Sequence, residues 1–222
     1  MRSRIIGGRA DVVVLGAGGG TGHRIVEEAL RHGHRVTAAV RSPGRFPAPD
    51  VSADAAAGLR VVHADVRDPE SLRLAIEGQD VVVSAVGPPG RRAAGLYSDG
   101  ARAVVAAMEQ GGVDRFLGIT SAGVRYDDPH LALWYRRLVR PLLGELYADM
   151  ILMERIVRTS SLDWTFVRPV LLLDRDPTGT YRVLDGATPE RGRTITRGDV
   201  AQFIVRELDE RRWSRCAPTL AL

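Results

Sequence analysis

Cysteine is almost absent from this chain, with a single residue, Cys216, among 222. One thiol excludes an internal disulfide and any cysteine-rich metal cluster, and it is compatible with a reducing compartment. No apolar run reaches the roughly 18 residues that a membrane-spanning helix needs. Residues 1–10 are polar and arginine-rich and lack the apolar core of a signal peptide, so we expect a flexible leader. These absences together predict a cytoplasmic protein that does not associate with membranes.

The chain also has little net charge, because 31 basic and 27 acidic side chains leave a formal charge of +4. The charges are spread along the chain without a basic patch, so nucleic-acid binding is not expected. The five histidines show no metal-ligand spacing, and no metal site is predicted. A length of 222 residues, 45% of them hydrophobic, suits one α/β domain over residues 11–222.

The most informative motif is a short apolar run, 11–15, that turns through glycines into the helix-like stretch 23–31. Gly16, Gly19 and Gly22 keep the spacing that permits a tight turn, a close approach of backbone to a diphosphate, and helix packing on the strand. The diphosphate would lie at the helix N-terminus, where unpaired N–H groups and the helix dipole favour negative charge. The motif therefore predicts a dinucleotide site formed by Gly16, Gly18, Gly19, Gly20, Thr21 and Gly22.

The residue after the second apolar run, 34–40, indicates which dinucleotide binds. An NAD-specific site places an acidic residue there, whereas this chain has Arg41, with Ser42 and Arg45 nearby. Guanidinium groups and a hydroxyl match a 2′-phosphate. We therefore expect NADP(H), with the alternative that Arg41 and Arg45 are ordinary solvated loop charges.

Apolar strand-like runs alternate with amphipathic helical stretches along most of the chain. Such alternation predicts parallel strands with right-handed crossovers, hence a single doubly wound Rossmann domain of the α/β class. From about residue 170 to 222, two short strands and a helix capped by Thr196 are expected to form a small substrate cap. The expected strands of the sheet are 11–15, 34–40, 59–64, 81–86, 115–120 and 164–167, and a long helical region over 131–159 is expected to be interrupted at Pro141.

From Val12 to about Leu208, the chain resembles the atypical short-chain dehydrogenase/reductase superfamily. Within it, the similarity is to the NAD(P)H-binding flavin reductase and biliverdin-IXβ reductase branch, close to NmrA-like proteins. The resemblance rests on Gly16-Ala-Gly-Gly-Gly-Thr-Gly22, Gly33-His-Arg-Val36 leading to Arg41, Asp65-Val-Arg-Asp68, Ser98-Asp-Gly-Ala-Arg-Ala-Val-Val-Ala-Ala-Met108, Gly112-Val-Asp-Arg115, Thr120-Ser-Ala122 and Leu162-Asp-Trp-Thr-Phe-Val-Arg-Pro169.

The resemblance implies roles for four further segments that follow strands. It places one segment beside the adenine, one along the cofactor after the fourth strand, one beside the nicotinamide, and one closing over the nicotinamide. In that order, the residues are Asp65 and Val66; Ala85, Val86 and Gly87; Thr120 and Ser121; and Pro169 and Val170.

The chain departs from the family's Tyr-x-x-x-Lys pair, in which lysine lowers the tyrosine pKa for proton donation. Tyr147 is followed four residues later by Ile151, so this tyrosine lacks its activator. That departure disfavours an ordinary ketone reductase and favours an acceptor that takes a hydride without strong acid help, such as a flavin, a quinone or a linear tetrapyrrole. Ser121 and Tyr147 are the catalytic candidates, although Ser121 could instead cap a backbone turn.

Three residues are candidates for contact with a small-molecule substrate. Trp134 and Tyr135 could stack on a flat acceptor or pack a helix onto the cap. Asp149 could face the cleft or be a solvated surface charge, and the latter is the commoner situation. We expect a monomer or homodimer. Two other functions stay open: a biosynthetic ketoreductase or epimerase on the same scaffold, and a non-catalytic NmrA-like NADP(H) sensor that binds a protein partner.

Overall fold

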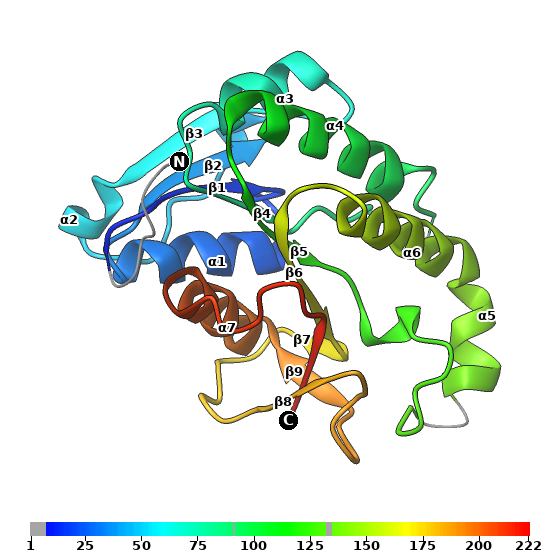
Figure 1. Ribbon diagram of the computed structural model, residues 1–222. Helices are drawn as coiled ribbons and strands as arrows, with labels where there is room; N and C mark the ends of the chain where they lie inside the picture. The colour runs from blue at the N-terminus through cyan, green and yellow to red at the C-terminus, as the bar shows by residue number, and fades with distance from the viewer. Residues whose placement is uncertain (1–7, 91, 132–134) are drawn as a thin grey trace.

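The computed structural model describes residues 8–90, 92–131 and 135–222, which form a central sheet covered by helices on both faces (Figure 1). The strand order is β3-β2-β1-β4-β5-β6-β10-β8, and every neighbouring pair is parallel except β10 and β8. The strands are β1 (Asp11–Leu15), β2 (Arg35–Val40), β3 (Leu59–His63), β4 (Val81–Ser84), β5 (Arg115–Ile119), β6 (Asp163–Pro169), β8 (Arg182–Asp185) and β10 (Pro218–Ala221).

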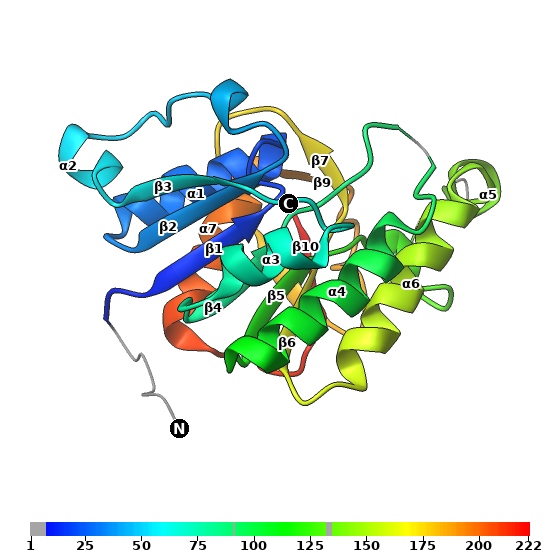
Figure 2. The ribbon, with the colours of Figure 1, turned by 90° about the horizontal axis from the view of Figure 1, so that it is seen from above.

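Apolar side chains on both faces of the strands explain the two helical layers. In β1, Val13 and Leu15 pack into one buried core, and Val12 and Val14 pack into the other. A strand that is apolar on both faces is typical of a parallel sheet buried between helices. One face is covered by α1 (Gly20–Arg31) and α7 (Arg197–Glu210), and the other by α3 (Pro69–Ile76), α4 (Leu96–Gly111) and α6 (Gly144–Arg158) (Figures 1 and 2).

Local signals in the sequence start and stop these helices. The Asp68 side chain caps α3, and Pro69 occupies its first turn, where the missing N–H costs nothing. Gly112 ends α4 in the left-handed conformation at φ 66°. The Thr196 side chain accepts a hydrogen bond from the Asp199 N–H and so caps α7, as the sequence predicts.

The chain reverses its direction of travel across the sheet between β1 and β4. It proceeds from β1 outward through β2 to β3 and then returns past β1 to β4. In open sheets of this kind, ligands bind beyond the carboxyl ends of the strands at such a switch point. The doubly wound α/β fold expected from the sequence is confirmed, and its topology positions the site next to β1 and β4.

The region expected to be one long helix is divided. A π-helix, η3 (Tyr135–Val139), is followed by α5 (Arg140–Leu142), and α6 starts only after Leu143. Pro141 lies in the first turn of α5, where its missing N–H is tolerated. The helical region is therefore interrupted, but the residue outside the helices is Leu143, two positions after Pro141.

Residues 171–222 form parts of two regions of the molecule. A two-stranded parallel ribbon, β7 (Leu171–Leu173) with β9 (Thr194–Thr196), is separate from the main sheet. In contrast, α7 packs against α1, and β10 joins β6 within the main sheet. The expectation that the helix belongs to a substrate cap is therefore corrected, because the apolar stripe of α7 is buried on the central sheet.

At the other end, Ala10 was expected within a flexible leader but is buried, and its N–H donates to His34 Nδ1. Residues 1–7 lie outside the described part of the chain. Among the residues that the structure describes, no helix is long and apolar enough to cross a membrane.

Candidate functional site

A cleft of about 720 Å³ lies beyond the carboxyl ends of β1 to β4, at the switch point of the sheet. Its walls are the glycine turn after β1, the short 3₁₀ helix η1 (Pro43–Arg45) after β2, and the loops after β3 and β4. The structure thus brings together segments that the sequence assigned separately to one dinucleotide. The predicted cofactor residues that line this cleft are Gly16, Gly18, Gly19, Arg41, Ser42, Arg45, Asp65, Val66, Ala85, Val86 and Gly87.

Close backbone packing explains the glycine turn. A Cβ at Gly22 would lie 2.2 Å from the Gly16 carbonyl oxygen, and one at Gly16 would lie 2.8 Å from the Ala85 oxygen. Gly16 also has φ +76°, a backbone conformation that residues with a side chain rarely adopt. The turn leads into α1, whose first turn contains no acidic residue. A helix N-terminus whose backbone is left uncovered by glycines can be approached closely by the diphosphate of a dinucleotide.

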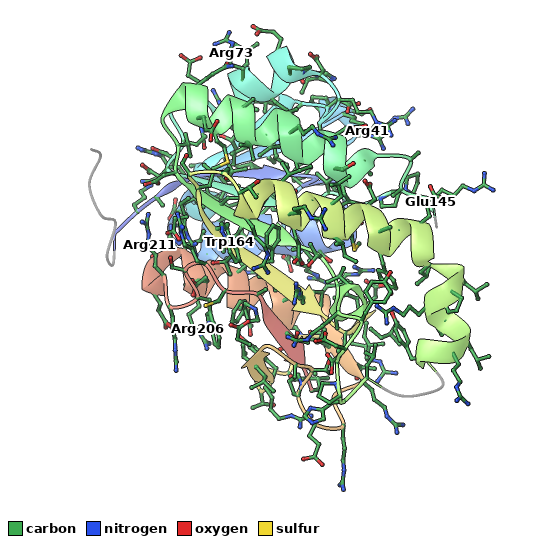
Figure 3. The ribbon with its side chains drawn as sticks, turned by 45° about the vertical axis from the view of Figure 1, so that its right-hand side comes forward. Arg41, Arg73, Glu145, Trp164, Arg206 and Arg211 are labelled. Carbon is green, nitrogen blue, oxygen red and sulfur yellow. The ribbon has the colours of Figure 1, made fainter. Side chains whose placement is uncertain are left out.

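The adenosine end of the cleft is cationic. Arg41, Ser42 and Arg45 are exposed, and Figure 3 shows Arg41 projecting from the edge of the molecule. Asp65, the nearby carboxylate, accepts a hydrogen bond from the Arg67 N–H at 2.9 Å. The cleft residues that follow β2, Arg41, Ser42 and Arg45, are basic or neutral. This arrangement suits a 2′-phosphate.

Two arginines in this wall were not predicted from the sequence. Arg67 and Arg92 line the cleft, and Arg67 Nη2 donates to the Ala94 carbonyl oxygen at 2.8 Å, which joins the loops after β3 and β4. Their signal in the sequence is weak, because each is one of many arginines that follow an apolar run.

The predicted nicotinamide end has a buried network around Glu154, a residue that sequence reasoning did not single out. Thr120 Oγ1 donates to Glu154 Oε1 at 2.9 Å, and Arg168 Nε donates to the same oxygen at 3.0 Å. Arg158 Nη2 donates to Glu154 Oε2 at 3.3 Å. With Glu154 only 5% exposed, the network fixes the carboxyl ends of β5 and β6 relative to α6.

The two catalytic candidates are engaged with neighbouring groups. Ser121 Oγ accepts a hydrogen bond from the Gly123 N–H at 3.1 Å, which caps the 3₁₀ helix η2 (Ala122–Val124). Tyr147 is 4% exposed, and its hydroxyl is hydrogen-bonded to the Tyr135 hydroxyl. A Cβ at Gly123 would lie 2.4 Å from Tyr147 Cζ, so the tyrosine packs directly on the turn that Ser121 caps.

The electrostatics of this end favour neutral tyrosines. Burial raises the pKa of Tyr97 to about 12, and burial together with the hydrogen bond to Tyr147 raises the pKa of Tyr135. The sequence contains no lysine, so lysine activation is unavailable to Tyr147 from any position. The arrangement suits hydrogen bonding better than strong acid catalysis.

Of the substrate candidates, Asp149 and Tyr135 do not line the cleft. Asp149 accepts hydrogen bonds from the Tyr97 and Ser98 N–H groups at 2.9 and 3.3 Å, so it anchors the start of α4. Tyr135 and Tyr147 pair as described, and Trp134 lies outside the described residues. The following predicted cofactor residues are not in the wall of the cleft: Gly20, Thr21 and Gly22 in the first turn of α1, Thr120 after β5, and Pro169 and Val170 at the end of β6.

In the described part of the chain, no group of three histidine, cysteine, aspartate or glutamate side chains could hold a metal ion.

Comparisons with known proteins agree with this geometry. The family model described as NAD(P)H-binding matches residues 16–211. The protein YwnB of Bacillus subtilis is 28% identical over 177 residues, 76% of each chain. The chain is 25% identical to the isoflavone reductase homolog A622 of Nicotiana tabacum over 88% of its own length and 59% of that protein.

Solved structures share the fold. The anaerobillin reductase ChuY of Escherichia coli O157:H7 is 25% identical with a TM-score of 0.75, over 95% of this chain and 96% of ChuY. A short-chain dehydrogenase/reductase of Veillonella parvula, solved in complex with NADP, is 18% identical with a TM-score of 0.80, over 96% of this chain and 94% of the other.

Proposed function

The chain belongs to the NAD(P)H-binding family, and from that premise we propose that it is an NADPH-dependent reductase of conjugated small molecules. The acceptor class is a flavin, a quinone or a tetrapyrrole-like compound. The observation that carries the proposal is the cleft itself, in which the glycine turn meets the cationic end of β2.

The preference for NADPH rests on the side chains at the end of β2. Arg41, Ser42 and Arg45 line the cleft where an NAD-specific site has a carboxylate. Two guanidinium groups and a hydroxyl stabilise a 2′-phosphate by charge-assisted hydrogen bonds. They offer nothing comparable to an unphosphorylated ribose, so binding should discriminate between the two dinucleotides.

The choice of acceptor rests on what the predicted nicotinamide end lacks. The bound reduced nicotinamide supplies a hydride. A conjugated acceptor spreads the incoming electron pair and can take its proton from water, so it needs no lysine-activated tyrosine. The absence of lysine and the Tyr135–Tyr147 hydrogen bond are consistent with this chemistry. The similarity to a protein described as an anaerobillin reductase supports a tetrapyrrole-like acceptor within this class.

Positioning is then the main contribution of the protein. Thr120 and Ser121 follow β5, and their hydroxyls are held by Glu154 and by the Gly123 N–H. The Ser121 hydroxyl accepts from Gly123 and retains its own proton. We propose that Ser121 donates this proton in a hydrogen bond that orients the acceptor. We place the reaction in the cytoplasm, where Cys216 would stay reduced.

Turnover with a panel of acceptors tests this function. The loss of absorbance of NADPH and of NADH is followed with FMN, FAD, a quinone and biliverdin, in the unaltered protein and in Ser121→Ala. We expect oxidation of NADPH in preference to NADH with at least one acceptor, and a lower kcat in Ser121→Ala. Tight NADP⁺ binding without turnover on any of these acceptors would overturn the reductase proposal and favour a sensor.

A further inference from the structure

Arg197, the first residue of α7, reaches across to the first turn of α1. Its Nη1 donates to Thr21 Oγ1 at 2.8 Å, although the two residues are 176 positions apart in the sequence. Its side chain also lies against Gly20, where a Cβ would be 3.2 Å from Arg197 Nε. Figure 1 shows α7 alongside α1, which explains how this contact arises. The C-terminal part of the chain therefore holds a guanidinium group at the first turn of α1, directly after the glycines that line the cleft.

Arg197 lies at the N-terminal ends of two helices. It occupies the first turn of α7 and lies over the first turn of α1, and the N-terminal end of a helix carries partial positive charge. The first turn of α1 contains no acidic residue. The first turn of α7 contains the buried carboxylate of Asp199, so the uncompensated positive helix end is that of α1. This end and the Arg197 guanidinium lie together, which favours an anion there.

The carboxylate that faces Arg197 is a weak partner. Arg197 Nε donates to Asp174 Oδ1 at 2.6 Å, but the Asp174 side chain is 80% exposed. Exposed ion pairs contribute little to stability. Asp199, in the first turn of α7, is fully buried, and its carboxylate accepts hydrogen bonds from the Thr178 and Gly179 N–H groups at 2.9 Å. It is therefore committed to anchoring the loop after β7.

The hydrogen bond to Thr21 has a defined direction. A guanidinium has donors only, so Thr21 Oγ1 must be the acceptor. The threonine hydroxyl proton then stays available for a second partner. Arg197 and Thr21 together present donors beside the unpaired N–H groups of the first turn of α1.

From these contacts we propose that Arg197 is a ligand of the dinucleotide diphosphate, supplied to the glycine turn by the C-terminal helix, and that Asp174 competes with the diphosphate for its guanidinium. The proposal rests on the nucleotide binding that the family implies, and it is independent of the acceptor. It adds a diphosphate contact that the glycine motif alone does not include. It also links nucleotide binding to the loop after β7, because Asp199 ties that loop to the same helix.

Equilibrium binding to three nucleotides tests the proposal. Dissociation constants are measured by titration calorimetry for NADP⁺, NAD⁺ and adenosine 2′-monophosphate, which lacks the diphosphate. Arg197→Ala should weaken NADP⁺ and NAD⁺ equally, by roughly 10- to 100-fold, since a hydrogen bond to a charged group is worth about 1.5–3 kcal/mol. It should leave adenosine 2′-monophosphate unchanged. Arg41→Ala should show the complementary pattern and weaken NADP⁺ and adenosine 2′-monophosphate but not NAD⁺.

Asp174→Asn should change dinucleotide affinity in the opposite direction. Removing the competing carboxylate while keeping Arg197 should tighten both dinucleotides by a few fold, about 2- to 5-fold for an exposed pair worth up to ~1 kcal/mol. Arg175→Ala and Asp176→Asn make the same charge changes on the same exposed loop and should leave all three constants unchanged.

A purely structural ion pair would give a different result. Arg197→Ala and Asp174→Asn would then both lower the melting temperature, and neither would change a dissociation constant, which would overturn the proposal. If Arg197→Ala does not fold, Asp174→Asn decides, because weaker or unchanged dinucleotide binding contradicts competition. Dinucleotide binding that depends on Arg197 without turnover of any acceptor would remove the proposed function and leave this inference standing.

Discussion

The nucleotide cleft and the predicted nicotinamide end, which is not part of the wall of that cleft, are built in different ways. At the glycine turn and the end of β2, the cleft is lined by glycines and by the exposed residues Arg41, Ser42 and Arg45. At the carboxyl ends of β5 and β6, the polar side chains already bond to one another, as Thr120 does with Glu154 and Tyr147 with Tyr135. The first end is therefore shaped by local backbone conformation, and the second by tertiary contacts.

This difference predicts which substitutions affect binding and which affect the acceptor. A change in the glycine turn should remove nucleotide binding together with stability. A change in the Glu154 network should reduce stability and turnover while nucleotide binding is retained. A change at the end of β2 should alter the choice of nucleotide alone.

Gly22→Ala should have the largest effect. The added methyl group would lie 2.2 Å from the Gly16 carbonyl oxygen, so the first turn of α1 must move away from β1. We expect a loss of about 3 kcal/mol in unfolding free energy, at the upper end for overpacking, and no detectable NADP⁺ binding. Urea denaturation and calorimetry measure the two effects.

Gly144→Ala is the matched control for that substitution. Gly144 begins α6, and nothing lies within 4 Å of the position of its Cβ. Alanine is the better helix former by about 1 kcal/mol, so the control should be neutral or slightly stabilising. Equal destabilisation by both substitutions would show that the glycine turn has no special packing requirement.

Glu154→Gln comes next in size. The change leaves the Arg168 guanidinium, which is mostly buried, without its carboxylate, and breaking a buried ion pair costs about 3–5 kcal/mol. We expect a fall in unfolding free energy near the lower figure and reduced acceptor turnover, with the dissociation constant for NADP⁺ within about 2-fold of the unaltered protein. Glu190→Gln, at an exposed position, is the control. A large loss of NADP⁺ affinity in Glu154→Gln would contradict the separation of the two ends.

Arg41→Ala should have a smaller and more selective effect. Loss of one charge-assisted hydrogen bond to a 2′-phosphate is worth about 1.5 kcal/mol, or about 10-fold in affinity. We expect the Michaelis constant for NADPH to rise by that factor while the constant for NADH is unchanged. Arg60→Ala removes another arginine that is exposed, on β3, and should change neither constant. Equal effects of Arg41→Ala on both nucleotides would remove the basis for the NADPH preference.

The same difference explains how much the sequence could predict. The glycine spacing and Arg41 are local features, and Gly16, Gly19 and Arg41 line the cleft. The sheet and most helix boundaries follow from local periodicity and caps such as Thr196. In contrast, the Arg197–Thr21 contact depends on how α7 packs on α1, which the expected substrate cap did not anticipate.

The predicted nicotinamide end shows the same limit of local reasoning. Asp149 was expected either at the substrate or at the surface, but it accepts hydrogen bonds from the first N–H groups of α4. In the sequence, Glu154 is one acidic residue among several in a helical stretch, although in the structure it joins Thr120 to Arg168. Partners such as these are set by which helix face meets which strand end, so residue type and spacing do not reveal them. The catalytic roles of Ser121 and Tyr147 stay predictions.

The smallest expected effect at neutral pH concerns the buried tyrosines of the predicted nicotinamide end. Burial raises the pKa of Tyr97 from 10.0 to about 12, so the folded protein retains a proton that the unfolded chain releases. The resulting stabilisation is present below pH 10 and is lost as the pH rises from about 10 to 12, because unfolding is then favoured by deprotonation. Tyr97→Phe should flatten the fall in unfolding free energy over that range, measured by urea denaturation at successive pH values. Tyr126→Phe makes the same change at an exposed tyrosine and is the control. An unaltered slope in Tyr97→Phe would show that the Tyr97 hydroxyl is solvated, and the predicted nicotinamide end would then be as open as the glycine turn.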